Sequence, residues 1–552
     1  MSELPLLTAL PVLCVKNLQI FAGNTVLVNR LNFDIKPGEI FALVGESGSG
    51  KSLTSLAIMR LLPPALSVSA DWVKLHQDDL FALPEYKMQA VRGRKVAMIF
   101  QEPMTSLNPV MKVGEQVAEV LRVHLKLSSK AARAQVVSLF EEVGIPNPSE
   151  RYDWYAHQLS GGQKQRVMIA MALACEPDLL IADEPTTALD VTIQAQVLDL
   201  LKQIRDKRGL AILFITHDMG VVSEMADTVA VMRQGEIVEM AEKNQFFNAP
   251  QHPYTQKLLQ DAVPKKQFRV INDGHTVLKL HDLKVHFPIK KGLFQRTVGY
   301  VKAVDGVCLE IKKGQTLALV GESGSGKSTI GQAILKLVHT TDGAVFFNAH
   351  DSNGTDSGVN LSQLSEKQMK PFRKKVQVIF QDPFSALNPR MTIQEIIREG
   401  MVSLKVGPQN RAWQDQRIEA LLAQVGLLSE HKTRYPHEFS GGQRQRIGIA
   451  RALAVEPELI ICDEPTSALD VTVRAQVLDL LEDLQKEYGM SYLFITHDLS
   501  IIPGIAHHVA VMQQGKIVEQ GSVQSVLQNP QHPYTKALLS SAPKLIQQTL
   551  LT

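Results

Sequence analysis

Short apolar runs alternate along this chain with glycine-rich segments and with longer stretches of helical period. The runs EIFALV, LLIAD and LFIT have the length and composition of buried strands. The segments LTSLAIMRLL and QRVMIAMALA carry apolar residues at helical spacing. LLIAD and its counterpart LIICD are apolar throughout and end in aspartate, which is typical of strands buried in a parallel sheet. The pattern predicts an α/β fold.

The whole pattern occurs twice. The recurring segments are GESGSGKS (45–52 and 321–328), FQEPMTSLNP and FQDPFSALNP (100–109 and 380–389), LSGGQKQR and FSGGQRQR (159–166 and 439–446), LLIADEPTTALDVT and LIICDEPTSALDVT (179–192 and 459–472), LFITHD (213–218 and 493–498), and QHPYT (251–255 and 531–535). A period this long indicates duplicated domains rather than a solenoid. We predict a first domain at 1–264, a polar linker at 265–275 and a second domain at 276–552.

Composition excludes several classes of protein. The 552 residues suffice for at least two hydrophobic cores, and the net charge of +2 gives no bulk signature of nucleic-acid binding. The four cysteines are far apart in sequence, so we expect buried thiols in a reducing compartment rather than a metal site or disulfides. No apolar run reaches the roughly 18 residues of a membrane-spanning helix, and the N-terminus lacks the features of a signal peptide.

GESGSGKS between a strand and a helix has the G-x-x-x-x-G-K-S spacing of a phosphate-binding P-loop. The glycines let backbone N–H groups approach phosphate oxygens, the lysine meets the β- and γ-phosphates, and the serine hydroxyl binds Mg²⁺. The residues predicted to bind ATP in this way are Gly45, Ser47, Gly48, Gly50, Lys51 and Ser52, and Gly321, Ser323, Gly324, Gly326, Lys327, Ser328 and Thr329.

Acidic residues follow the buried strand of each copy. Asp183 and Asp463 end their strands, where a carboxylate can reach Mg²⁺. The adjacent Glu184 and Glu464 can face the attacking water. In isolation an Asp-Glu pair is more often part of a solvated loop, but the P-loop upstream favours the catalytic interpretation.

An LSGGQ segment between a P-loop and a DEP strand resembles the nucleotide-binding domain of ABC-type ATPases, here in two copies that span almost the entire chain. The resemblance implies a mixed core sheet, an antiparallel β subdomain and a helical subdomain in each domain. It also implies two composite ATP sites between head-to-tail domains, in which each P-loop meets the signature of the other copy. The signature residues are Ser160, Gly161, Gly162 and Gln163, and Ser440, Gly441, Gly442 and Gln443.

Further residues correspond to family positions one at a time. Gln101 and Gln381 match the glutamine that senses Mg²⁺ and water, and His217 and His497 match the histidine that contacts the γ-phosphate. Asp190 and Asp470 match the aspartate of a loop at the domain interface. Because glutamate, lysine and histidine occur in both copies, we expect two competent sites.

The adenine-stacking aromatic of the family is the one position that the sequence leaves open. It lies about 23 residues before the first glycine of the P-loop. In the first copy this position is Ala22, and Phe21 is adjacent to it; in the second copy Phe287 and Tyr300 compete for it. For each of the three, an ordinary aromatic buried in a strand is the favoured interpretation.

The segments after Gln101 and Gln381, together with the QHPYT segments, resemble the ATPases of peptide/nickel importers, and the fused arrangement most resembles the Yej-type peptide importer ATPases. The resemblance implies two permease subunits, which dock near 101–109 and 381–389, a periplasmic solute-binding protein, and a place on the cytoplasmic face of a bacterial inner membrane. Glutathione, nickel or an antimicrobial peptide stay open as cargo. Because no cysteine follows Cys462, we expect no iron–sulfur cluster.

A soluble twin ATPase acting on ribosomes or DNA is the alternative. It is disfavoured by the short linker, the absence of zinc-binding cysteines and the near-neutral charge.

QHPYT itself has the pattern of the start of a short helix, in an extension at about 240–264 and 520–545. Pro253 and Pro533 suit the first helical position. Tyr254 and Leu258 lie four residues apart and share one helix face; Tyr534 and Leu538 repeat the spacing. We expect the helices to stop by Pro264 and Pro543, and we interpret them as docking helices rather than ligand sites.

Overall fold

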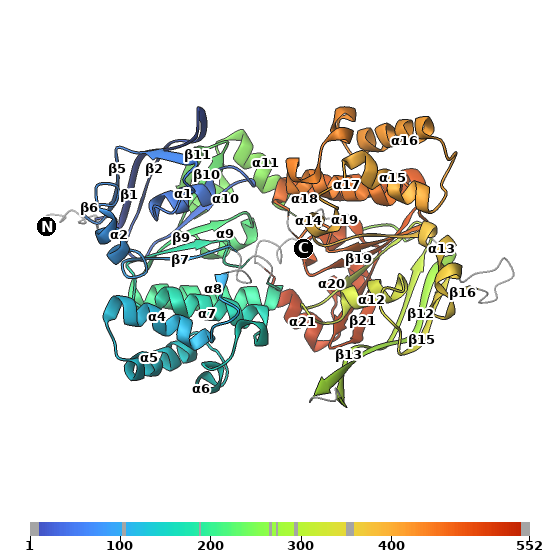
Figure 1. The fold of residues 1–552 in the computed structure, drawn as a ribbon, viewed down its shortest axis with the longest axis horizontal. Helices are drawn as coiled ribbons and strands as arrows, with labels where there is room; N and C mark the ends of the chain where they lie inside the picture. The colour runs from blue at the N-terminus through green and yellow to red at the C-terminus, as the bar shows by residue number, and fades with distance from the viewer. Residues whose placement is uncertain are drawn as a thin grey trace. The chain divides into compact units, whose positions relative to one another are not determined.

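The computed structural model describes most of the chain, namely residues 10–101, 106–186, 189–263, 268–271, 274–291, 296–348, 358–467 and 469–542. The chain divides into two compact units (Figure 1). The first unit consists mainly of residues up to Ala262, and the second consists mainly of residues after it. The first unit holds the first copy of the motifs, and the second unit holds the second copy.

A six-stranded sheet forms the centre of the first unit. In spatial order its strands are β11 (Glu236–Glu242), β10 (Thr228–Arg233), β3 (Ile40–Val44), β9 (Ala211–Thr216), β8 (Leu179–Asp183) and β7 (Val96–Ile99). The strands β10, β3, β9, β8 and β7 are parallel, and β11 is antiparallel to β10. Every residue of β3, β8 and β9 is buried, which accounts for their unbroken apolar sequences.

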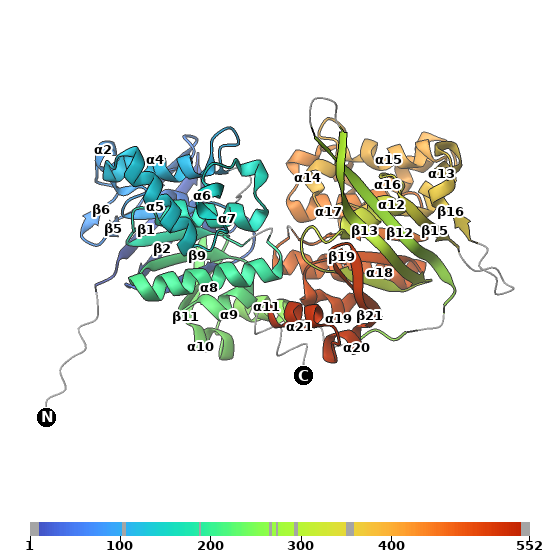
Figure 2. The same ribbon diagram turned by 90° about the horizontal axis from the view of Figure 1, so that it is seen from below.

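A second, antiparallel sheet and a group of helices complete the first unit. The antiparallel strands are β1 (Leu13–Ala22), β2 (Thr25–Ile35), β4 (Leu66–Ser69), β5 (Trp72–Leu75) and β6 (Asp78–Asp79). The helices are α1 (Lys51–Ile58), α2 (Glu85–Val91), α4 (Val113–Leu125), α5 (Ser129–Glu142), α6 (Pro148–Arg151), α7 (Gly161–Leu173), α8 (Val191–Arg208), α9 (Met219–Met225), α10 (Lys243–Asn248) and α11 (Pro253–Ala262), with a 3₁₀ turn at Ala156–Gln158. Figure 2 shows α4 to α7 gathered at one end of the unit, away from α9 and α10.

The second unit repeats this architecture. Its six-stranded sheet has the corresponding order β21 (Lys516–Ser522), β20 (His508–Gln513), β14 (Thr316–Val320), β19 (Ser491–Thr496), β18 (Leu459–Asp463) and β17 (Val376–Ile379). Its antiparallel strands are β13 (Arg296–Lys312), β12 (Thr276–Lys291), β15 (Asp342–Phe347) and β16 (Val359–Asn360). The helices are α12 (Lys327–Ile334), α13 (Glu366–Lys375), α14 (Pro383–Ala386), α15 (Ile393–Ser403), α16 (Arg411–Gln424), α17 (Gly441–Leu453), α18 (Val471–Tyr488), α19 (Ile502–Ile505), α20 (Val523–Gln528) and α21 (Pro533–Ser540), with 3₁₀ turns at Leu361–Gln363, Ser429–Thr433, Pro436–Glu438 and Leu499–Ile501.

The structure therefore confirms the predicted mixed sheet, antiparallel sheet and helical subdomain in each unit. One boundary differs from the sequence prediction. Helix α1 ends at Ile58 rather than continuing through LTSLAIMRLL, and Arg60 adopts a left-handed backbone conformation with φ 54°. In the part of the chain that the structure describes, no helix combines the length and apolarity needed to cross a membrane.

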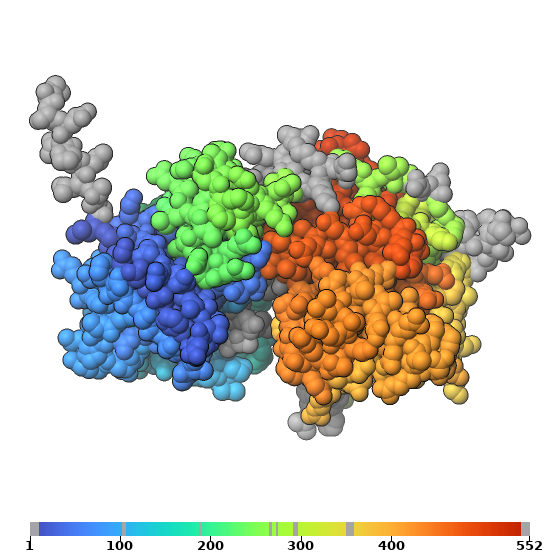
Figure 3. Space-filling view, turned by 90° about the horizontal axis from the view of Figure 1, so that it is seen from above, coloured from blue at the N-terminus to red at the C-terminus, as the bar shows by residue number. Residues whose placement is uncertain are grey.

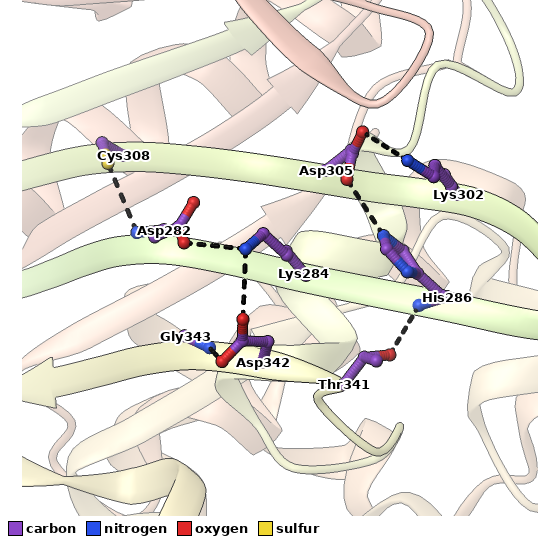
Figure 4. A network of polar contacts seen from close by, with 9 residues as sticks. All are labelled: Asp282, Lys284, His286, Lys302, Asp305, Cys308, Thr341, Asp342 and Gly343. Atoms are coloured by element: carbon purple, nitrogen blue, oxygen red, sulfur yellow. Dashed lines mark hydrogen bonds and ion pairs between the residues drawn. The ribbon is translucent and has the colours of Figure 1, made fainter.

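The antiparallel hairpin is longer in the second unit. Strands β12 and β13 have 16 and 17 residues, against 10 and 11 for β1 and β2. Polar contacts hold its base to β15 (Figure 4). Lys284 on β12 bridges Asp282 and Asp342 at 2.8 and 3.1 Å, and these hydrogen bonds raise its pKa. The ring of His286, also on β12, lies 3.1 Å from a carboxylate oxygen of Asp305 on β13.

The QHPYT segments begin the last described helix of each unit, as predicted. Helices α11 and α21 start at Pro253 and Pro533. Tyr254 and Leu258 are 8% and 3% exposed, so the predicted face of α11 is buried; on α21 the corresponding leucine is buried and the tyrosine half-buried. Pro264 and Pro543, which we expected to end the helices, lie outside the described residues.

A glutamate on the preceding strand holds the start of each of these helices. Glu519 on β21 accepts hydrogen bonds from the backbone N–H groups of Gln531 and His532 at 2.7 and 3.1 Å. The Nδ1 atom of His532 in turn accepts from the backbone N–H of Tyr534 at 3.2 Å and caps α21. Glu239 makes the corresponding pair of hydrogen bonds in the first unit.

Strand β11, which carries Glu239, also joins the extension to the antiparallel sheet of the first unit. The backbone N–H of Asn29 on β2 donates to the carbonyl of Gly235 at 2.8 Å, and its side chain donates to Glu236 at 2.7 Å. Figure 3 shows the green surface of the extension beside the dark blue surface of β1 and β2.

A segment of the predicted linker is bound to the second unit. The guanidinium of Arg269 donates twice to the carbonyl of Gly504, at 2.9 and 2.6 Å, and pairs with Glu482 at 2.6 Å. Phe268 packs against the apolar core of the same unit.

We expect Glu519→Ala to release the start of α21, because two backbone N–H groups lose a charged acceptor. Hydrogen bonds to charged groups contribute about 1.5–3 kcal/mol each, so hydrogen exchange at residues 531–540 should accelerate at least about tenfold. Glu239→Ala should have this effect at 251–262 only. Unchanged exchange at 531–540 in Glu519→Ala would contradict the anchoring role.

Candidate functional site

In each unit the motif residues gather at one edge of the six-stranded sheet. In the first unit GESGSGKS follows β3, Gln101 follows β7, Asp183 ends β8 and His217 follows β9. These strands are parallel, so their carboxyl ends meet, and ligands of open α/β sheets bind outside such ends. The sheet thus assembles residues that lie far apart in sequence.

The first glycine of each P-loop passes very close to a neighbouring strand. Gly45 and Gly321 have φ of 148° and 151°. A Cβ atom at either position would lie 2.1 or 2.2 Å from the carbonyl oxygen of Met232 on β10 or Met512 on β20. Such an approach excludes every side chain, so the loop must begin with glycine.

The P-loop lysine is buried and held by its own loop. The Nζ atom of Lys51 donates to the carbonyls of Gly45 and Glu46, both at 2.8 Å. Lys327 makes the corresponding hydrogen bonds at 2.7 and 2.8 Å, and burial lowers its pKa. The loop therefore fixes the ammonium group beside the position that we predict for phosphate.

The other predicted residues of the loops lie around this lysine. Gly50 and Gly326 cap α1 and α12 with left-handed backbones, φ 105° and 108°. The first N–H groups of a helix have no partner within the helix and can bind phosphate. The middle of each loop is exposed, and Thr329 is half-buried. The exposed loop residues are Ser47, Gly48, Ser323 and Gly324.

A serine hydroxyl and a buried carboxylate face each other in both units. Ser52 Oγ donates to Asp183 at 3.1 Å, and Ser328 Oγ donates to Asp463 at 2.8 Å. Burial raises the pKa of Asp183 to about 6 and raises the pKa of Asp463 as well.

These two oxygen donors fit a Mg²⁺ ion that takes its other ligands from phosphate and water. A nearby cation would favour the carboxylate form that burial disfavours. Within the described ranges, no three His, Cys, Asp or Glu side chains form a metal cluster.

The catalytic glutamates that we predicted contact the predicted glutamine and histidine. Gln101 Nε2 donates to Glu184 at 2.8 Å, and the Nδ1 atom of His217 lies 3.0 Å from the other carboxylate oxygen. Gln381 and His497 lie 2.9 and 3.2 Å from Glu464. The structure therefore brings each predicted Gln–Glu–His set together within one unit.

The backbone of these glutamates is strained. Glu184 and Glu464 have φ of 48° and 45°, a left-handed conformation that costs a residue with a side chain about 1–3 kcal/mol. Their N–H groups are held by the carbonyls of Ile215 and Ile495 at 2.9 and 3.0 Å. Parallel strand pairing thus maintains the conformation in which each carboxylate contacts its glutamine and histidine.

Electrostatics favour an ion pair at the second site. Burial opposes charge on Glu464, but hydrogen bonding to His497 lowers the pKa of the carboxyl below its usual range. Burial also opposes charge on His497, and the same contact raises the pKa of the ring. The pair holds the carboxylate in its charged form, which is the form that can accept a proton or a hydrogen bond from water.

The signature segments start helices in the helical subdomains. Ser160 caps α7, with its Oγ accepting from the N–H of Gln163 at 3.3 Å while the glutamine side chain accepts from the N–H of Ser160. Ser440 and Gln443 form the same capping box on α17. The signature serines therefore organise the first turn of a helix in each unit.

Their glycines allow close helix packing. A Cβ atom on Gly162 would lie 2.6 Å from Ile193 on α8, and one on Gly442 would lie 2.3 Å from Val473 on α18. Gly161 and Gly441 have open space around the position of a Cβ atom, so the first turn of each helix is accessible to a ligand.

The sequence interpretation missed the role of the aspartate after each histidine. Asp218 and Asp498 cap the turns that follow, accepting from the N–H groups of Gly220 and Ser500 at 2.8 and 2.9 Å. Asp498 also pairs with Arg474 at 2.6 Å. The repeated LFITHD segment contained this signal, because Asp is a preferred N-cap residue.

The favoured interpretation of the aromatic residues as buried strand positions is wrong for two of them. Phe287 and Tyr300 are 42% and 60% exposed. They lie on the long hairpin, one on each strand, where Phe287 pairs with Val301 and Tyr300 with Pro288. Phe21 on β1 is half-buried.

Comparison with known protein families identifies the chain. The ABC transporter family model matches residues 28–187 and 304–467, one match in each unit. The chain belongs to the ABC transporter family. A model described as the C-terminal region of oligopeptide/dipeptide transporters matches residues 238–272 and 518–551 of this ABC ATPase. These segments contain both QHPYT helices.

Curated relatives cover almost the whole chain. The peptidoglycan transport ATP-binding protein YejF of Agrobacterium fabrum is 47% identical over 540 residues, 96% of each chain. The glutathione import ATP-binding protein GsiA of Shigella flexneri is 48% identical over 569 residues, 96% of this chain and 89% of its own. A solved dimeric ATP-binding cassette bound to ADP and Pi is 27% identical over 45% of this chain and 98% of its own, with a TM-score of 0.39.

We expect Ser440→Ala to destabilise the second unit by about 1 kcal/mol through loss of the cap, and Ser440→Asp to retain stability because aspartate is an equally good cap. ATP turnover should fall in both variants, most strongly in Ser440→Asp, because a carboxylate at the start of α17 repels phosphate. Urea unfolding and ATPase assays measure the two effects. Ser128→Asp, at the cap of α5, is the matched control and should retain both properties. If Ser440→Asp kept full ATP turnover, Ser440 would act only as the cap of α17 and would have no role at the ATP site.

Proposed function

We propose that this ABC ATPase hydrolyses ATP to power the import of peptides through separate permease subunits, using two composite ATP sites. The observation that carries the proposal is that each unit assembles a complete set of P-loop lysine, serine–aspartate pair and Gln–Glu–His group at one sheet edge. The matches to the oligopeptide/dipeptide C-terminal region support the cargo class. The two relatives are named for the transport of peptidoglycan and the import of glutathione.

In the proposed in-line hydrolysis, each group of residues in a site has its own role. The P-loop N–H groups and the lysine bind and orient the β- and γ-phosphates. Glu184 or Glu464 orients the attacking water and accepts its proton, while the neighbouring glutamine and histidine hold the carboxylate in place. Bound Mg²⁺, held by Ser52 and Asp183 or by Ser328 and Asp463, would neutralise charge that develops on the phosphates.

The signature helices would complete the sites across the two units. Ser440 to Gln443 would face the nucleotide on Lys51, and Ser160 to Gln163 would face the nucleotide on Lys327. The accessible first turns of α7 and α17 support this role, since exposed N–H groups and the positive end of a helix bind phosphate. ATP would then favour a closed pair, and hydrolysis would reopen it.

The adenine platform in the second copy would be one of the exposed aromatics of the long hairpin. Phe287 and Tyr300 present their rings to solvent, so either can stack on a base without prior rearrangement of a core. Phe21 is the candidate in the first copy.

Two permeases would dock beside Gln101 and Gln381, on the cytoplasmic face of an inner membrane, and receive cargo from a solute-binding protein. The second docking region presents Phe380 and Phe384, which are 39% and 61% exposed. The guanidinium of Arg444, on the signature helix α17, lies 3.8 Å from the ring centroid of Phe384. A permease helix that moves Phe384 would therefore act directly on the signature helix.

We expect Glu184→Gln and Glu464→Gln each to reduce ATP turnover, and the double variant to reduce it at least about 100-fold, because water loses its proton acceptor. Steady-state phosphate release measures the effect, and nucleotide binding serves as the folding control. Wild-type turnover in the double variant would exclude a catalytic role for the two glutamates. Loss in only one single variant would show that the two sites are not equivalent.

Co-expression with two candidate permeases should recover the ATPase in a complex from detergent-solubilised membranes. Phe384→Asp should weaken this recovery, because a charge cannot replace an aromatic ring in an apolar contact. Tyr86→Asp, at a 70% exposed aromatic on α2, is the matched control and should leave recovery unchanged. Recovery with ribosomes or DNA alone would favour the soluble twin-ATPase alternative.

A further inference from the structure

The C-terminal extension of the second unit contacts the P-loop. Tyr534, the second residue of α21, accepts a hydrogen bond on its hydroxyl from the backbone N–H of Glu322 at 3.0 Å. Glu322 is the second residue of GESGSGKS. The contact joins residues 212 positions apart, and it gives a QHPYT residue a place beside the nucleotide site.

The position of this hydroxyl is set by the fold of the extension. Glu519 fixes the two residues before α21, and His532 caps the helix by accepting from the N–H of Tyr534. The ring packs against the apolar core, as does Leu538 one turn later. Burial raises the pKa of Tyr534, so the hydroxyl stays protonated at neutral pH.

Glu322 transmits this contact to the lysine that binds phosphate. Its N–H is bound by Tyr534, and its carbonyl accepts from Lys327 Nζ at 2.8 Å. The preceding Gly321 lies close to the backbone carbonyl of Met512 on β20, the strand that leads into the extension. The start of the P-loop is therefore bound on two sides by the chain segment that ends in α21.

We propose that Tyr534 is a positioning residue for the second ATP site, and that docking of the C-terminal extension raises the nucleotide affinity of that site. The hydroxyl fixes Glu322, Glu322 fixes Lys327, and Lys327 meets the phosphates. The inference rests on the proposed function in one respect, that the second P-loop binds ATP. It adds that the segment shared with oligopeptide transporters acts on the nucleotide as well as on the packing of the unit.

The first unit contains the same tyrosine in a different setting. The guanidinium of Arg233 lies 4.8 Å from the ring centroid of Tyr254, whereas Gln513 stands at the corresponding position of the second unit. The pair Tyr254 and Tyr534 therefore provides matched hydroxyl deletions in one chain.

The test measures ATP binding in a Lys51→Ala background, where occupancy reports the second site. Tyr534→Phe removes one oxygen and keeps the ring. One hydrogen bond contributes about 0.5–1.5 kcal/mol, so we expect the Kd for ATP to rise about two- to tenfold. Tyr254→Phe in the same background should leave the Kd unchanged. In the otherwise unmodified chain, Tyr534→Phe should raise the KM for ATP and leave kcat within about twofold, since the side chain of Glu464 is held by Gln381 and His497.

The outcomes distinguish a tyrosine that positions the P-loop from one that only stabilises the fold of the second unit. Equal ATP affinity in the Lys51→Ala parent and in its Tyr534→Phe derivative would overturn the inference, as would a weaker affinity accompanied by a lower Tm and faster hydrogen exchange throughout the second unit. Absence of ATP binding in the Lys51→Ala parent would instead contradict the proposed function. A higher Kd with an unchanged Tm and unchanged exchange in α21 would support the inference.

Discussion

The close approach of Gly45 and Gly321 to the carbonyl oxygens of Met232 and Met512 is the constraint on which each unit depends. It fixes where the P-loop leaves the sheet, and so it fixes the lysine, the first turn of the following helix and the serine beside the aspartate. It also ties the loop to β10 or β20, the strands that lead into the C-terminal extension. The proposed nucleotide site and the C-terminal extension are thus built on the same strand end.

The proposed hydrolysis also depends on a glutamate whose backbone is strained and whose carboxylate is charged. Parallel pairing holds Glu464 in a left-handed conformation, and His497 keeps its carboxylate ionised although burial opposes charge. Neither influence is local in sequence, since β18 and β19 are separated by α18. The same geometry recurs around Glu184, so the duplication has reproduced a long-range arrangement as well as a set of short motifs.

Much of this could be predicted from the sequence, because the P-loop, the DEP strands and the LSGGQ helices have local physical signatures. Glycine spacing, apolar runs ending in aspartate and an N-cap serine each specify their own surroundings. The exposure of Phe287 and Tyr300 could not be predicted, because it depends on how far β12 and β13 extend beyond the sheet that they join. The contact between Tyr534 and Glu322 has no sequence signal at all, since it depends on the path of the chain through β20, β21 and α20. Asp218 and Asp498 are an intermediate case, in which the capping preference was visible but the aspartate was not interpreted.

The hydrogen bonds of Lys51 and Lys327 to their own loops have a consequence for the thermodynamics of binding. A lysine on the surface loses up to about 2 kcal/mol of rotamer entropy when a ligand immobilises it. Here the side chains are 5% and 4% exposed and already ordered by carbonyl groups. That entropy was lost when the chain folded. A phosphate bound at the proposed site would therefore meet a preorganised cation, and the cost of ordering the lysine would not reduce the association free energy.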